Sequence, residues 1–226
     1  MLRRFLQKHY SYPALLSAEE FYAPIHEFLD SRLAEFGFIR PKQGVWVRED
    51  SLSARPMFEL RHLKGAVSVP VSGFALNYVP HFNNSCTKLY WHRTVKSAKL
   101  DVFPFDEFEQ TQDLTRFATP QDHAIAVNHV LGAAFDRAIE FFNEFRSTDD
   151  LLPLFERLRC YEGKGLGYWN YVNMPIAHAF TLRVIGDYVR GRSILDECVR
   201  RMKIAGPALA DLSNRFEQAT ANPSLH

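Results

Sequence analysis

Apolar and polar positions alternate repeatedly between Gly44 and Pro104, a stretch rich in Val, Phe, Tyr and Trp. A period of two is typical of a β-strand, whose successive side chains point to opposite faces of the sheet. The densest segment, residues 65–80, predicts one or two strands. Further strands are predicted at Val45–Glu49, Met57–His62, Lys88–Thr94 and Lys99–Phe103. The short links between them favour antiparallel pairing, because parallel strands need long crossover connections.

The apolar residues of segment 65–80 change parity near its middle. The valines at positions 67, 69 and 71 share one face, whereas the apolar residues at 74, 76 and 78 have the opposite parity. One extra residue at Ser72-Gly73 would restore a common face, so a β-bulge or a break is predicted there. Pro70 has no amide hydrogen to donate, and it predicts an edge or an interruption of the sheet.

A helical pattern precedes the strands. Ser17 and Glu20 have the spacing of a capping box, in which each side chain binds the other residue's backbone amide. Gly37 is expected to end this helix, and Pro24 should kink it or shift its start. Its apolar residues keep helical spacing and predict one buried stripe: Phe21, Ile25, Phe28, Leu29 and Phe36.

Helical patterns return after Asp106. Thr119 is predicted to cap a long amphipathic helix that runs from Pro120 to about Arg146. Shorter helices are predicted from Asp149 or Asp150 to Arg159, from Asn173 to about Arg190, and from Ser193 with a break at Gly206-Pro207. We predict an α+β fold, with an antiparallel sheet of about five strands preceded by one helix and followed by a helical C-terminal half. Residues 1–226 are expected to form a single domain, sheet-rich over 38–105 and helix-rich over 119–220, with helices on one face of the sheet.

Composition and charge argue against several classes of protein. The chain has 27 basic and 26 acidic residues, a net charge of +1, so we do not expect nucleic-acid binding that depends on neutralising phosphates. No run of about eighteen apolar residues occurs, and no membrane span is expected. The three cysteines lack metal-ligand spacing and favour a reducing compartment, which makes the cytoplasm the expected location.

Histidines in or beside the strands are the first candidates for chemistry. The neutral imidazoles of His62, His81 and His92 can bind zinc if the sheet brings them together. The chain contains no His-x-His or His-x-x-x-His pair, and single histidines on strands more often have structural roles. We therefore predict no metal and no cofactor.

Trp91, His92 and Arg93 follow one another on a predicted strand. Trp91 and Arg93 share one face, because side chains two residues apart point the same way. An arginine beside an aromatic ring can hold a carboxylate or a phosphate while it stacks on the ring. The alternative is an arginine stem packed over an aromatic cluster. With His81, which lies at a strand end, these three are the candidate binding residues.

Motifs for covalent or phosphate chemistry are missing from the chain. It has no Gly-x-Ser-x-Gly, and the glycine-rich segment Glu162–Trp169 matches neither the Walker pattern nor Gly-x-Gly-x-x-Gly. No catalytic residue is predicted.

A first helix runs into Gly37-Phe38 and is followed by Gly44-Val-Trp-Val-Arg-Glu49. Strands around residues 73–81 and 91–93, and helices at 176–190 and 193–202, complete the pattern. In these features the chain resembles bacterial domain-of-unknown-function proteins, some of which are encoded near polymorphic toxins as immunity proteins. The resemblance implies an α+β fold and a binding function. It names no target and no catalytic residues.

Our leading hypothesis is a cytoplasmic bacterial protein that acts by binding another protein rather than by catalysis, since aromatic residues and Arg are enriched at protein interfaces. The alternative is a small-molecule or metal-dependent enzyme with its site at the strand ends around His81, His92 and Arg93. A third hypothesis, a single-stranded nucleic-acid binder that stacks bases on strand aromatics, is opposed by the balanced charge. The sequence predicts neither the ligand nor the oligomeric state.

Overall fold

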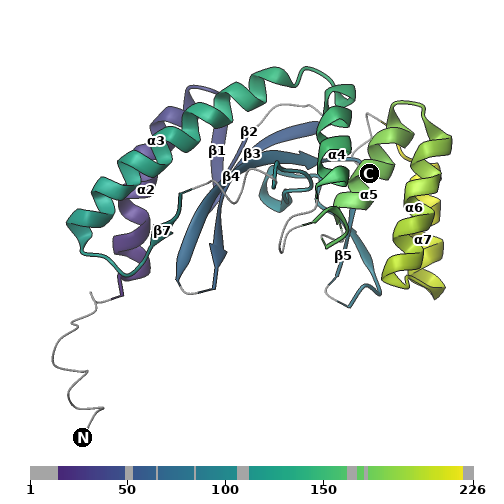
Figure 1. Cartoon of the computed structure of the whole chain (residues 1–226), viewed down its shortest axis with the longest axis horizontal. Coiled ribbons are helices and arrows are strands. Elements are labelled where there is room, and N and C mark those ends of the chain that lie inside the picture. Colours follow the sequence, from purple (N-terminus) through teal and green to yellow (C-terminus); the bar gives the residue numbers. More distant parts are fainter. Residues whose placement is uncertain are drawn as a thin grey trace, which may run out of the picture.

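The computed structural model describes residues 15–48, 53–64, 66–83, 85–105, 112–161, 167–170 and 173–220. A five-stranded antiparallel sheet has the strand order β1-β2-β3-β4-β7. The strands are Phe38–Lys42, Val45–Arg48, Ala54–Leu63, Val67–Leu76 and Leu114–Thr115, in that order. Helix α2 (Ala18–Ala34) precedes the sheet, and the C-terminal half is helical (Figure 1). The predicted fold class is confirmed.

Three of the predicted strands belong to this sheet, as β2, β3 and β4. The strand predicted at Lys88–Thr94 is shorter: it forms β6 (Leu89–Trp91), which pairs with β5 (Pro80–Phe82) in a separate two-stranded ribbon. Residues 99–103 form only an isolated bridge, between Val102 and Phe74 of β4, instead of the predicted strand. The sequence pattern does not predict β1, which contains a proline, or β7, which has only two residues.

Strand β4 has no bulge at Ser72-Gly73, contrary to the prediction. Its ten residues pair with β3 without a register shift. The apolar residues change parity because both faces of β4 are covered, one by α3 through Phe74 and the other by the segment after Val95. A Cβ atom at Gly73 would lie 2.2 Å from the carbonyl oxygen of Val102. Gly73 therefore permits the close approach of that segment and does not mark a bulge.

Pro70 lies inside β4, opposite Leu60 of β3. On the other side of β4, β7 pairs only with Val67 and Ser68. Within the described strands, Pro70 therefore has a ladder partner on one side alone. This position agrees with the predicted edge, because proline cannot donate a hydrogen bond to a second neighbour.

Helix α2 begins at the predicted capping box. Glu20 accepts a hydrogen bond from the amide of Ser17 (2.8 Å), and the Ser17 hydroxyl accepts one from the amide of Glu20 (3.2 Å). The helix continues through Pro24, and Gly37 follows its end with a φ angle of +79°. Four apolar side chains are fully buried: Phe21, Ile25, Leu29 and Leu33. Phe36 lies beyond the helix end and is exposed, so its predicted place on the buried stripe is wrong.

The described C-terminal helices are α3 (Pro120–Glu144), α4 (Leu151–Cys160), α5 (Asn173–Val184), α6 (Tyr188–Met202) and α7 (Gly206–Glu217). Thr119 caps α3, and α7 starts at the predicted Gly206-Pro207 break. The helix predicted from Asn173 to Arg190 is divided at Gly186, which has a φ angle of +96°. Asp187 then caps α6 by accepting from the amide of Arg190 (3.2 Å), so Ser193 does not begin a helix.

One hydrophobic cluster contains buried residues from the sheet and from the C-terminal helices. Helices α2 and α3 lie side by side against the sheet, while α5, α6 and α7 gather at its other end near β5 (Figure 1). The buried hydroxyl of Tyr78, just after β4, lies 3.0 Å from the hydroxyl oxygen of Thr181 on α5. The two halves therefore share a core.

Candidate functional site

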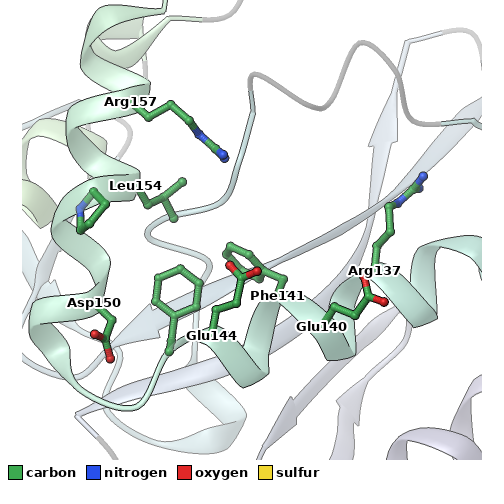
Figure 2. A pocket seen from close by; sticks show the side chains of 9 residues that line it. Arg137, Glu140, Phe141, Glu144, Asp150, Leu154 and Arg157 are labelled. Atoms are coloured by element: carbon green, nitrogen blue, oxygen red, sulfur yellow. The ribbon is translucent and has the colours of Figure 1, made fainter.

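A groove of about 620 Å³ lies between the C-terminal end of α3 and the first turns of α4. Figure 2 shows side chains from both helices directed toward it. We call this feature the α3–α4 groove. Its volume lies within the range of about 300–1,000 Å³ that is typical of ligand sites.

The turn between α3 and α4 fixes the relative position of the two walls. One carboxylate oxygen of Asp150 accepts hydrogen bonds from the amides of Arg146 and Ser147, each 2.7 Å long, and these bonds lower the pKa of Asp150. The Thr148 hydroxyl lies 3.1 Å from that of Ser53, next to β3, and ties the turn to the sheet. Both walls are therefore positioned by the fold itself.

The floor of the groove is apolar. The rings of Phe141 and Phe145 lie 4.7 Å apart, and both contact Phe74 of β4, at 5.5 and 4.8 Å between centroids. Leu154 of α4 is buried, whereas the two phenylalanines are half-buried and line the groove. An apolar side chain placed on this floor would gain about 25 cal/mol for each Å² of apolar surface removed from water.

Charged side chains form the rim of the groove. Arg137, Glu140 and Glu144 are exposed on α3, and Arg157 extends toward the groove from α4 (Figure 2). Within the described part of the chain, Arg137, Glu140 and Glu144 take part in no ion pair. Glu140 and Glu144 are four residues apart on the helix, where like charges repel one another.

Several exposed or half-buried charges elsewhere in the helical half are neutralised by a neighbour on the same helix. Three such pairs are Arg192–Asp196 (3.0 Å), Arg201–Glu197 (2.8 Å) and Arg215–Asp211 (2.8 Å). Each joins residues four positions apart, which is the spacing that stabilises a helix surface. The two unpaired glutamates therefore distinguish the groove wall from these helices.

His81 belongs to a buried polar network that occupies both of its ring nitrogens. Nε2 lies 2.8 Å from Oδ1 of Asp101, and Nδ1 lies 2.6 Å from Nδ2 of Asn173. Asp101 also accepts from Asn173 Nδ2 (3.0 Å) and from the amide of Leu76 (2.7 Å). A neutral imidazole that donates from Nε2 and accepts at Nδ1 satisfies these contacts. No ring nitrogen of His81 is left for a substrate or a metal. The hydrogen bonds of the network instead connect β5, β4 and α5 to one another.

The strand histidines do not meet at one point. His92 lies beside His81, with 4.7 Å between ring centroids, and burial together with His81 lowers the pKa of His92 to about 4. His62 instead bonds to the hydroxyl of Tyr22 on α2, and its Nδ1 lies 2.7 Å from Oγ of Ser68. Over the described ranges, no group of three His, Cys, Asp or Glu side chains is arranged to hold a metal ion.

Arg93 stacks on Trp91, with 3.8 Å between its guanidinium carbon and the ring centroid. Its Nε donates to the carbonyl oxygen of Asn77 at 3.1 Å. Arg215 of α7 contacts the same ring at 4.7 Å. The four candidate residues are thus neighbours in the β5–β6 ribbon or just after it, but His81 faces a closed network whereas Arg93 is half-buried against an aromatic ring.

Several strand aromatics that could stack nucleic-acid bases are buried. Trp46, Phe58 and Tyr78 are each 1% exposed. A stacking surface needs rings that bases can reach. These three rings therefore contribute to the core and offer no platform for a single strand.

The sequence pattern does not single out the α3–α4 groove. The apolar residues that keep helical spacing along the predicted long helix include Phe142 and Phe145 but not Phe141. The adjacent pair Phe141-Phe142 widens the apolar face at the end of this helix, and that widening is the feature that indicates a second contact surface. The angle between α3 and α4 creates the groove, and the apolar pattern of neither helix predicts that angle.

No protein-family model, curated protein or solved structure matches this chain. The functional argument therefore depends on the geometry of the molecule. In the ranges that the structure covers, no helix has both the length and the apolar character needed to cross a membrane.

Proposed function

We propose that this protein acts by binding another protein, and that the α3–α4 groove is the surface on which the partner docks. The observation that carries the proposal is an apolar floor, Phe141 and Phe145, beside two carboxylates, Glu140 and Glu144, that lack an ion-pair partner among the described residues. The complementary partner is a polypeptide segment with an apolar side chain for the floor and a lysine or arginine for the glutamates.

Two contributions to partner binding, one from the glutamates and one from the apolar floor, are unused in the free chain. A charge-assisted hydrogen bond to one of the glutamates would contribute about 1.5–3 kcal/mol, and it would relieve their mutual repulsion. Burial of one large apolar side chain would contribute about 1.5–3 kcal/mol when it is complete. Their combination favours a partner with a basic residue next to an apolar one.

The identity of the partner is a further part of the proposal. If the chain is an immunity protein, like some members of the group that it resembles, the docked segment belongs to a toxin. The thiols of Cys86, Cys160 and Cys198 are unpaired, which supports a reducing compartment such as the cytoplasm. The enzyme hypothesis stays a prediction without support from this arrangement, because His81 has no free ring nitrogen and His62 lies apart.

A charge reversal in the groove tests the proposal. Tagged wild-type, E144K and E27K proteins would be expressed in the source organism, and the polypeptides that each retains would be quantified by mass spectrometry. Glu27 is an exposed glutamate on α2, outside the groove, and it matches the charge change. We expect one polypeptide to be retained by the wild type and E27K and reduced about tenfold or more with E144K, because reversal adds repulsion to the lost attraction.

A selection with random peptides tests the chemistry of the partner directly. Peptides captured by the wild type and counter-selected against E144K should carry Lys or Arg beside an aromatic or aliphatic residue. The groove is excluded as the docking surface if all three proteins retain the same polypeptides and the selected peptides bind E144K as well as they bind the wild type.

A further inference from the structure

Trp91 contacts two arginines that come from different elements. Arg93 lies two residues beyond the end of β6, and its guanidinium carbon lies 3.8 Å from the ring centroid. Arg215 comes from α7, and its guanidinium carbon lies 4.7 Å from the same centroid. Two positive charges are therefore brought together on one half-buried ring.

The hydrogen bonds leave one of these cations without a negative partner. Arg215 is paired with Asp211 of its own helix, at 2.8 and 3.1 Å. Arg93 donates only from Nε, to the carbonyl oxygen of Asn77 at 3.1 Å. Among the described residues no carboxylate pairs with Arg93, and its two terminal nitrogens have no acceptor. The local charge is positive, and free donors remain on both arginines: the terminal nitrogens of Arg93 and the buried Nη1 of Arg215.

Leaving this guanidinium unpaired is unfavourable. Arg93 is half-buried, and burial followed by the charge of Arg215 lowers the pKa of Arg93. An arginine still stays protonated at neutral pH, so the repulsion is not relieved by loss of a proton. A negative group beside Arg93 would relieve it.

We propose that Arg93, held on Trp91 with Arg215 nearby, binds an oxyanion group of a ligand, either a carboxylate or a phosphate. The terminal nitrogens of a guanidinium form a planar fork that donates two parallel hydrogen bonds to such a group. Trp91 fixes the plane of the fork, and Arg215 adds attraction through its charge. This site lies on β6 and α7, apart from the α3–α4 groove, so either proposal can fail alone.

The indole N–H resonance of Trp91 in NMR spectra reports on this site. The full-length protein would be titrated with inorganic phosphate and, separately, with acetate, at constant ionic strength maintained with chloride. We expect the Trp91 resonance to shift saturably in the wild type. Arg93→Gln should weaken the fitted affinity by about tenfold or more, since a charge-assisted bond is lost. Arg93→Lys should also weaken it, because an ammonium cannot form the bidentate contact.

Arg32 provides a matched control. It is an exposed arginine whose guanidinium carbon lies 4.1 Å from the ring centroid of Phe28 on α2. Arg32→Gln should leave the titration of Trp91 unchanged. Tighter binding of phosphate than of acetate would indicate a phosphorylated ligand, and the reverse a carboxylate. The proposal is overturned if the wild type shows no saturable shift with either anion at concentrations well above millimolar, or if Arg93→Gln titrates like the wild type.

Discussion

Asp101 is 3% exposed and accepts hydrogen bonds from His81, from Asn173 and from the amide of Leu76. A buried carboxylate is stable only when such partners replace the water that it has lost. Here the donors come from three separate parts of the chain, at the end of β4, in β5 and at the start of α5. The network therefore fixes these elements relative to one another.

Removal of Asp101 should consequently destabilise the fold. Asp101→Ala removes the acceptor of three donors, two of them on buried residues, and we expect the free energy of unfolding to fall by about 2–4 kcal/mol. Urea denaturation monitored by circular dichroism measures this change. Asp196→Ala is the control, because Asp196 is exposed and its one ion pair among the described residues is with Arg192 on α6, so its loss should cost about 0.5 kcal/mol or less. Equal losses in the two variants would contradict a structural role for the network.

His81 also shows what the sequence can reveal about single residues. Its type and its place at a strand end identify it as a candidate for chemistry. Its partner Asn173 lies 92 residues away in the sequence, and no spacing rule connects them. Residue type was therefore sufficient to find the cluster, whereas the assignment of both ring nitrogens required the tertiary structure.

At the scale of elements, local patterns predict helix ends well and the two-sided packing of β4 poorly. The capping box at Ser17 and the cap at Thr119 depend on residues three positions apart, so both can be predicted from the sequence. The parity change in β4 arises because other residues pack on both of its faces. On one face, the packed residues lie about thirty positions further along the chain. The bulge predicted at Gly73 was wrong for this reason.

Two glycine substitutions with opposite expected effects test this account. Gly73→Ala would place a Cβ atom 2.2 Å from the carbonyl oxygen of Val102, and we expect a loss of about 3 kcal/mol or more in unfolding free energy. Gly132→Ala in α3 would place one no closer than 3.9 Å to Phe28, and we expect a gain of about 0.5–1 kcal/mol from helix propensity. Chemical denaturation of both variants measures the difference. If Gly73→Ala leaves the unfolding free energy unchanged, the segment after Val95 does not pack on β4 as described.

At the scale of the whole molecule, the α+β class follows from local periodicity and link length, both of which the sequence contains. The strand order does not, because the paired residues of β4 and β7 lie more than forty positions apart in the sequence. The α3–α4 groove is equally non-local, since it depends on how the turn at Asp150 is tied to Ser53. Surfaces created between elements are thus the part of this molecule that sequence patterns describe least.

The shared core predicts that the sheet and the helical half unfold together. Trp46 is buried in β2 and becomes the only tryptophan in a W91F/W169F background, so its fluorescence reports on the sheet while far-ultraviolet circular dichroism reports chiefly on the helices. We expect one urea transition with the same midpoint by both methods. Tyr78→Phe in this background removes the hydrogen bond to Thr181 and should lower the unfolding free energy by about 1 kcal/mol in both signals. Helical signal lost at a lower urea concentration than the Trp46 signal would instead mean that the two halves are separate folding units joined by a weak interface.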